Sequence, residues 1–406
     1  MNGMIARIAW RNLWRHPQRT ILMIATVGVG SLVILVLFGL TDGVLGSMTA
    51  TQIDWNQGNF QVRSANYADD PIPENALSPA QVAIAMDALA TMETVGISPR
   101  IEVTGMLRSA YGTDGVMIRG VNADFEQAVT HLDQLVIEGT YLTAPGQILI
   151  SDIVAVDLDI RIGERVVVLA IGAEGAESKA FTVTGLFQSP SSDLEHMTLA
   201  SMDDVQAMTG FEGTTSIAVS LPRGSSDSRA VTQARELLAG HEGIAVADYF
   251  DLNPFARFMI AGSTIKMIPF VIMISLMAGF GVANTAFYSV LERTREFGVM
   301  TAVGMSRKLL ARMVLVESTI VAAIGFILGG GLGYWGLVYL SKAGWDISSM
   351  TDMAGSVGLP RVIYASTSGW YWAAALSVVV FTALAAAWYP ARRVNQLEPV
   401  TAIREG

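Results

Sequence analysis

The chain has 406 residues, of which 51% are hydrophobic and only 15% are charged. Soluble domains carry about a quarter charged residues, so this composition excludes an ordinary soluble protein. The formal net charge of −10 excludes the basic footprint of a nucleic-acid-binding protein, and the absence of cysteine excludes disulfides and thiolate metal sites.

Residues 1–19 predict a cytoplasmic helix that lies in the membrane interface. Arginines recur every four residues from Arg7 to Arg15, on one narrow helix face, and two tryptophans lie nearby. Aromatic side chains at headgroup depth are typical of interfacial helices. Pro17 is expected to end this helix and to turn the chain into the first span. The alternative is a basic flank that only fixes the orientation of the span.

Four apolar runs reach the length of about 20 residues that crosses a bilayer. A cleaved signal peptide is the alternative for the first run, but that run is longer than a usual signal-peptide core and lacks a convincing cleavage site. Four uncleaved transmembrane helices are therefore predicted, and a helical outer stalk precedes the second. Their ranges are 20–41, 259–290 (with the stalk), 313–340 and 369–389.

The third apolar run contains Gly325, Gly329 and Gly333 at a spacing of four residues. Small residues at this spacing let two helix backbones approach closely. The spacing predicts a tight helix contact, either within the chain or across a dimer.

The placement of charge predicts the orientation. Basic residues gather in the N-terminal segment, in 291–312 and in the tail 390–406, whereas residues 43–258 hold 11 basic and 28 acidic residues. With four spans, the three basic segments lie on one side, which the positive-inside rule makes cytoplasmic. Both termini are therefore predicted in the cytoplasm, and the loop 341–368 is predicted outside.

Residues 42–258 predict an extracytoplasmic α+β domain. Strand and helix patterns follow one another in the flanks 42–140 and 211–258. The middle part, 141–210, contains short apolar runs separated by glycine and acidic turns, which indicates mostly β structure. We therefore expect an α+β domain that carries a β-rich insertion.

Signatures of catalysis are absent from the sequence. It contains no G-x-x-x-x-G-K-[ST] phosphate loop, no H-E-x-x-H zinc motif and no G-x-S-x-G nucleophile elbow. The chain is therefore predicted to be no enzyme and to bind neither a metal nor a cofactor of its own. Glu317 is the one carboxylate inside an apolar run, and a salt bridge to Arg312 or another basic flanking residue is expected; an intramembrane relay is the alternative.

A charged segment, 291–312, separates the second and third apolar runs and is predicted to be a cytoplasmic contact surface. Gly298 and Gly304 are expected to permit a tight turn at each end of a short helix. Phe297 and Val303 belong, with Val299 and Met300, to an apolar face that suits docking in a groove of another protein. The alternative is a plain connector between spans.

The segment ERTREFGVMTAVGMSR resembles the cytoplasmic loop of permease subunits in the FtsX/MacB-like (type VII) superfamily of ABC transporters, with Phe297 in place of the usual aliphatic residue. The matching residues are Glu292, Arg293, Glu296, Gly298, Ala302 and Gly304.

Both ends of the chain carry further resemblances. The start, WRNLWRHPQRT, resembles the N-terminal elbow of the family, and the end, YPARRVNQLEPVTAIREG, resembles its C-terminal motif, with Thr401 where an acidic residue is frequent. The topology resembles the family as well. The matching residues are Asn12, Leu13, Arg15 and Arg19 at the start and Pro390, Ala391, Arg392, Arg393, Pro399, Ala402 and Arg404 at the end.

The resemblance implies a permease of the bacterial inner membrane that works with a cytoplasmic ABC ATPase dimer, which would use ATP and Mg²⁺. A second permease copy or paralogue, membrane lipids and a periplasmic carrier or adaptor are the other implied partners, and the outer domain is implied to be a porter-like fold with a sabre-like insertion. The implied ATPase-coupling residues are Glu292, Arg293, Arg295, Glu296, Phe297, Gly298, Ala302 and Gly304.

Release of outer-membrane lipoproteins is the nearest function by length and topology. The alternatives are a MacB-like permease of a tripartite efflux system, and a mechanotransmission regulator of an envelope partner such as a cell-wall hydrolase. A membrane-anchored receptor without an ATPase is the alternative outside the family. Candidate lipid contacts, with core packing as the alternative, are Val33, Leu37, Leu40, Met267, Phe270, Val271 and Ile274.

Overall fold

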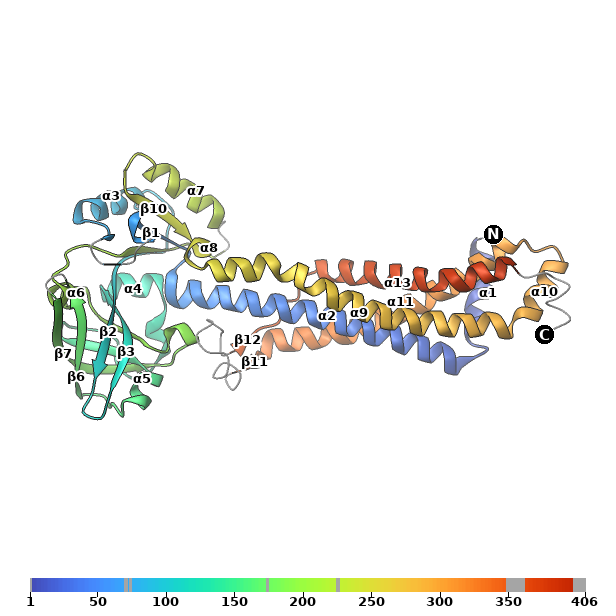
Figure 1. Ribbon diagram of the computed structural model, residues 1–406, viewed down its shortest axis with the longest axis horizontal. Coiled ribbons are helices and arrows are strands. Elements are labelled where there is room, and N and C mark those ends of the chain that lie inside the picture. Colours follow the sequence, from blue (N-terminus) through green and yellow to red (C-terminus); the bar gives the residue numbers. More distant parts are fainter. Residues whose placement is uncertain are drawn as a thin grey trace. The chain divides into compact units, whose positions relative to one another are not determined.

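Two compact units make up the chain, and the computed structural model describes residues 2–68, 72, 75–172, 175–223, 227–347 and 362–396. Unit 1 comprises Met1–Leu45, Ile260–Trp345 and Ile363–Gly406, and unit 2 comprises Gly46–Met259 and Asp346–Val362 (Figure 1). Of the predicted outer loop 341–368, residues 348–361 lie outside the described residues.

Long apolar helices form unit 1. Four of the helices in the described part of the chain are long and apolar enough to cross a membrane, which confirms the predicted number of candidate spans. These four helices are α2 (Pro17–Gln52), α9 (Pro254–Glu292), α11 (Arg307–Ala343) and α13 (Trp370–Gln396). Three of them contain a predicted run in full, and α13 begins one residue after the predicted start of the fourth run at 369. Two shorter helices accompany them, α1 (Asn2–Leu13) and α10 (Thr294–Ala302).

The turn between α1 and α2 differs from the prediction. Pro17 is the first residue of α2, and α1 ends earlier, at Leu13. Proline suits the first helical position because the amide hydrogen that it lacks would have no partner there. The Thr20 hydroxyl donates to the carbonyl oxygen of Leu13 at 2.6 Å and so satisfies one of the open carbonyls at the end of α1.

Glycines bring α2 and α11 into close contact within the chain. A Cβ atom built on Gly329 would lie 1.9 Å from the carbonyl oxygen of Gly28, and one built on Gly325 would lie 2.8 Å from Val27 Cβ. A Cβ on Gly333 would lie 3.3 Å from Leu32 Cα. The predicted glycine contact is therefore intramolecular at these positions.

A ten-stranded mixed sheet organises unit 2. Its strand order is β10-β1-β9-β2-β3-β8-β5-β7-β4, and β6 pairs with β2 and β7. The strands are β1 (Phe60–Ser64), β2 (Gly96–Arg108), β3 (Thr113–Val121), β4 (Val136–Gly139), β5 (Gln147–Ser151), β6 (Arg165–Gly172), β7 (Gly175–Phe187), β8 (Met197–Ser201), β9 (Ser216–Ser220) and β10 (Ile244–Asp248).

Short helices accompany this sheet, and a two-stranded sheet pairs β11 (Trp345–Asp346) with β12 (Val362–Ile363). A π-helical turn, Ile53–Gln57, follows α2 directly. The α-helices of unit 2 are α3 (Pro79–Leu89), α4 (Ala123–Val129), α5 (Asp152–Asp157), α6 (Met202–Thr209), α7 (Asp227–Leu238) and α8 (Tyr249–Leu252).

Two main hydrophobic cores lie on this one sheet. The first joins β1 and β9 to α3 and α7, which lie on the same side of β1 and β10 in Figure 1. The second joins β2, β3 and β5–β8 to α5 and α6. Residue 141, the predicted start of the insertion, does not separate these two cores. Strand β2 lies before residue 141 and is 13 residues long, and it connects the two parts of the sheet because it pairs with β9 at its start and with β3 and β6 further on.

Candidate functional site

The predicted docking segment is the short helix α10, between α9 and α11. It ends at Ala302, and Gly304 follows with φ +101°, a conformation that favours glycine after a helix end. The turn predicted at Gly304 is therefore confirmed. The turn predicted at Gly298 is wrong, because Gly298 lies buried in the middle of α10.

The apolar residues of α10 point to two different sides. Phe297 is only 2% exposed and packs against Val290, Leu310 and Val314 in a core at this end of unit 1. Val299 is 48% exposed, and Val303, the first residue after α10, is 84% exposed. The prediction of one apolar face is therefore wrong. Successive helical residues are turned by about 100°, so positions two apart, such as Phe297 and Val299, cannot share a face.

Ion pairs join α10 and the end of α9 to the turn after α1 and to the first turn of α2. Arg15 Nη1 lies 2.9 Å from Glu296 Oε1, and the guanidinium of Arg19 donates to both carboxylate oxygens of Glu292. These side chains are largely exposed, so water screens both pairs and each contributes little to the stability of the fold.

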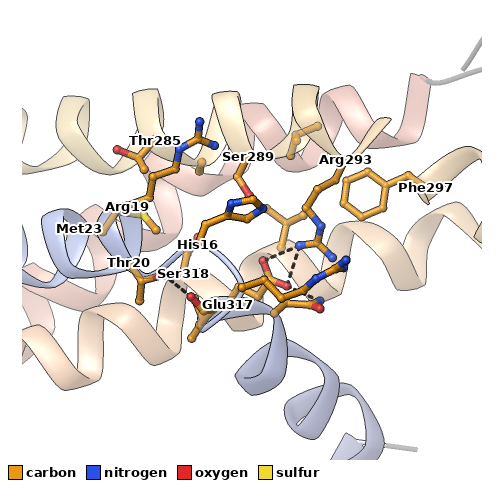
Figure 2. Close-up of a pocket in the computed structure, with 16 residues that line it drawn as sticks. His16, Arg19, Thr20, Met23, Thr285, Ser289, Arg293, Phe297, Glu317 and Ser318 are labelled. Atoms are coloured by element: carbon orange, nitrogen blue, oxygen red, sulfur yellow. Dashed lines mark hydrogen bonds and ion pairs between the residues drawn. The ribbon is translucent and has the colours of Figure 1, made fainter. Parts of the chain in front are cut away.

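Glu317 on α11 is the centre of a more buried network. Arg293 Nη1 lies 3.2 Å from Glu317 Oε1, and Asn12 Nδ2 donates to the same oxygen at 2.9 Å. Figure 2 shows Arg293 directed toward Glu317, beside the ring of Phe297. The guanidinium carbon lies 5.2 Å from that ring centroid, within the range of a cation–π contact. The basic partner expected for Glu317 is therefore present, but it is Arg293 and not Arg312.

The carboxylate of Glu296 is held in its charged form. Partial burial raises the pKa of Glu296, but the hydrogen bond and charge of Arg293 and the charge of Arg15 outweigh burial, so the net pKa lies below its usual range. Glu296 is therefore ionised near neutral pH and can keep both arginine partners.

Two hollows lie around these residues. Arg293 and Glu317 are among the residues that line a cavity of about 50 Å³ (Figure 2). A groove of about 520 Å³ runs along α1 and α10. The residues that line the groove are Ile8, Asn12, Arg15, Arg293, Arg295, Glu296, Val299, Met300 and Met313.

The eight predicted coupling residues divide by exposure. Arg293, Phe297 and Gly298 are buried, and Glu296 is half-buried. The exposed members are Glu292, Arg295, Ala302 and Gly304. Asn12, Arg15 and Glu317 also belong to this site and were not predicted as coupling residues, although the motif positions of Asn12 and Arg15 and the lone carboxylate of Glu317 in an apolar run were visible indications.

The predicted lipid contacts do not converge on one site. Val271 lines an apolar groove of about 690 Å³ between α9 and α13, whereas Ile274 packs in the core that contains Ile34. Val33 and Phe270 are exposed. The half-buried members are Leu37, Leu40 and Met267.

The C-terminal motif is described only in part. Ala391 is buried and belongs to the same core as Phe297, and the guanidinium of Arg392 lies 4.9 Å from the ring centroid of Trp388. The Arg393 side chain and residues Pro399, Ala402 and Arg404 lie outside the described residues.

Two family models match the sequence of these apolar helices and of the mixed-sheet unit. The model described as "MacB-like periplasmic core domain" matches residues 20–237, and the model described as "FtsX-like permease C-terminal" matches residues 268–399. The chain belongs to the MacB/FtsX-like family of ABC transporter permeases. The resemblance inferred from the motifs is thereby confirmed.

Similar proteins share parts of this permease sequence. The macrolide export ATP-binding/permease protein MacB of Sodalis glossinidius is 25% identical over 406 residues, 96% of this chain and 58% of that protein. The uncharacterized ABC transporter permease YknZ of Bacillus subtilis is 32% identical over 131 residues, 32% of this chain and 28% of that protein. The permease thus spans 58% or less of the length of these relatives.

Two solved structures are similar at low identity. The periplasmic region of MacB from Actinobacillus actinomycetemcomitans has 12% identity and a TM-score of 0.34, and the match covers 47% of this chain and 87% of that one. The extracellular domain of YknZ from Gram-positive bacteria has 15% identity and a TM-score of 0.34, and the match covers 47% of this chain and 99% of that one.

Proposed function

We propose that this permease receives force from a separate cytoplasmic ABC ATPase through α10 and passes it to the extracytoplasmic domain formed by unit 2. The observation that carries this proposal is that Phe297 on α10 is buried, whereas Val299 on the same helix and Val303 directly after its end are exposed. ATP and Mg²⁺ bind the ATPase, and the end of unit 1 that contains α10 faces the cytoplasm.

The packing of α10 suits transmission of movement. The ring of Phe297 fills a core formed by the ends of α9, α11 and α13, so a displacement of α10 moves all three or opens a cavity. Close-packed interiors resist such cavities. The contacts of Arg293 and Asn12 with Glu317 extend the same rigid group to α1.

A partner would bind the exposed face. Val299 and Val303 provide apolar surface, and Arg295 next to them is exposed. A short helix that places apolar side chains in a groove of its partner, surrounded by charged neighbours, is a common mode of recognition. The predicted coupling role therefore belongs to the exposed residues, while Phe297 and Gly298 hold the helix in place.

We propose that the permease acts in the release or export of a lipoprotein or of another lipophilic envelope substrate. The groove between α9 and α13 supports a lipophilic substrate, because its lining surface is mostly apolar and includes the rings of Phe280 and Phe381. A MacB-like efflux permease is the second candidate, since the matched relatives include proteins called macrolide export ATP-binding/permease protein.

The docking proposal is tested by affinity purification of the full-length permease from native membranes. Wild-type protein should retain an ABC ATPase subunit, and Val303→Asp should reduce the retained amount at least several-fold. Val156→Asp is the matched control, because Val156 is a similarly exposed valine, 78% accessible, on unit 2. Failure of the wild type to retain any ATPase, or equal retention by both variants, would overturn the proposal.

The substrate is tested separately. Membranes that lack the permease should accumulate lipoprotein at the inner membrane if it acts in lipoprotein release, and cells should become sensitive to macrolides if it acts in efflux. If the permease instead regulates a cell-wall hydrolase, its loss should change neither lipoprotein accumulation nor macrolide sensitivity and should alter cell-wall cleavage.

A further inference from the structure

One face of α1 has no partner among the described residues. Ala9 and Leu13 are buried and Ile8 is half-buried, so these residues form the inward face of the helix. The outward face, which we define as Arg7, Trp10, Arg11 and Trp14, is exposed throughout. At about 100° per residue, these four positions form one continuous surface opposite Ala9 and Leu13.

The two tryptophans form an exposed aromatic pair. Trp10 and Trp14 are 47% and 51% exposed, and their rings meet edge to face with centroids 6.0 Å apart. Two adjacent indoles in water are unfavourable, whereas the membrane interface accommodates both the apolar ring and the polar N–H group. This pair therefore indicates contact with a bilayer surface.

The arginines of this region divide into two classes. Arg15 and Arg19 pair with glutamates of the α9–α10 region. Arg7 and Arg11 make no ion pair among the described residues, although they lie one turn apart beside the tryptophans. A guanidinium group binds phosphate oxygens through two parallel hydrogen bonds, so this free pair fits a phosphate-bearing surface.

We propose that the outward face of α1 binds the headgroups of anionic phospholipids in the membrane that the long helices cross. The indoles would lie at the boundary between headgroups and acyl chains, and Arg7 and Arg11 would contact the phosphates. Anionic headgroups are preferred over zwitterionic ones because an ammonium group offsets the phosphate charge in the latter. Each arginine near an anionic surface contributes about fivefold in affinity.

This binding also bears on α10. Asn12, on the same helix, donates to Glu317 of α11, and Arg15 pairs with Glu296 of α10. Lipids that hold the outward face of α1 therefore also restrain the segment that carries α10. The lipid proposal itself does not depend on an ATPase partner, because it concerns only this helix and the membrane.

The experiment uses the full-length permease in lipid nanodiscs made of phosphatidylcholine and phosphatidylglycerol. One or the other lipid carries bromine on its acyl chains, and bromine quenches nearby tryptophan fluorescence. The quenching that is due to Trp10 and Trp14 is the difference between the quenching of the wild type and that of a Trp10→Phe/Trp14→Phe variant. We expect this quenching to be stronger with brominated phosphatidylglycerol than with brominated phosphatidylcholine.

Charge variants test the role of the arginines. Arg7→Gln/Arg11→Gln should abolish the preference for phosphatidylglycerol, and Arg7→Lys/Arg11→Lys should keep most of it. Arg165→Gln/Arg229→Gln is the matched control, since both residues are exposed arginines of unit 2. High salt should weaken the preference of the wild type.

Three results would overturn the proposal. Equal quenching by the two lipids would show that the headgroup charge is not recognised. An unchanged preference in the glutamine variant would exclude Arg7 and Arg11 as its source. Absence of quenching by either lipid would show that water or another protein, such as an acidic segment of a partner, covers this face.

Discussion

Asn12 on α1 and Glu317 on α11 lie 305 residues apart in the sequence and share a hydrogen bond of 2.9 Å. The same carboxylate oxygen of Glu317 also lies 3.2 Å from Nη1 of Arg293, which stands between α9 and α10. One side chain therefore links the elbow at the N-terminus, the junction before α10 and the third candidate span. Its loss should affect all three at once.

We predict that Glu317→Ala destabilises unit 1 by about 1–3 kcal/mol, because buried Arg293 loses a charged acceptor and keeps only Glu296. Thermal unfolding of the detergent-solubilised protein measures this effect. Arg312→Gln is the control, since Arg312 is exposed and flanks the same helix. Equal melting temperatures for the two variants would contradict the network.

The pair of Arg15 and Glu296 should contribute less, about 0.2–1 kcal/mol, because both side chains are largely exposed. Glu296→Arg should loosen α10 by placing like charges beside Arg15 and Arg293, and the exchanged pair Arg15→Glu/Glu296→Arg should restore part of the loss. Hydrogen exchange of residues 294–302 measures this at low salt. A double-mutant cycle with no coupling between the two positions would exclude a direct pairing.

Gly329→Ala should destabilise unit 1, because the added methyl group would lie 1.9 Å from the Gly28 carbonyl oxygen and would separate α2 from α11. Gly331→Ala is the matched control on the same helix, since a Cβ atom there meets nothing within 4 Å. Because alanine has a higher helix propensity than glycine, Gly331→Ala should leave the stability of unit 1 unchanged or raise it by about 1 kcal/mol. Thermal unfolding of both variants tests this contrast, and a Gly329→Ala protein as stable as the control would exclude the close contact.

A fully buried ion pair ties α4 to β2 in unit 2. Arg100 donates from Nη2 to Glu126 Oε1 at 2.7 Å and from Nε to Glu126 Oε2 at 2.9 Å, and its Nη1 donates to the carbonyl oxygen of Asn56 at 2.6 Å. Glu126→Gln should destabilise unit 2 by about 3–5 kcal/mol, because the charge of Arg100 stays buried without its partner. Urea unfolding followed by circular dichroism measures this, with Arg235→Gln at the exposed Arg235–Asp251 pair as control.

The same pair gives unit 2 a defined pH dependence. Burial raises the pKa of Glu126, but the charges of Arg100 and Arg119 and the hydrogen bonds from Arg100 and Ser98 outweigh it, so its folded-state pKa lies below the ordinary 4.5. The unfolded chain therefore binds protons more readily than the folded one. The stabilisation is complete above pH 4.5 and should be lost as the pH falls through the folded pKa. Glu126→Gln should show a shallower acid dependence than the wild type in the same urea titration.

Properties that depend on neighbouring residues could be predicted from the sequence. The apolar runs of about 20 residues gave the four candidate spans, because membrane crossing depends on local length and composition. The turn at Gly304 followed from glycine at the end of a short helical pattern. The charged interruption before it identified the candidate site, and the motifs around it identified the family.

Choices between equally plausible contacts needed the tertiary structure. The pattern did not tell which apolar residues of α10 face inward, because Phe297 and Val299 are both apolar and the rotation of the helix is set by packing against α9, α11 and α13. Composition likewise could not choose between Arg293 and Arg312 as the partner of Glu317, or predict that β2 serves two cores. The sequence by itself determined which long segments are apolar or charged, since these are local properties. The three-dimensional fold decided which side chains meet, since that depends on residues hundreds of positions apart.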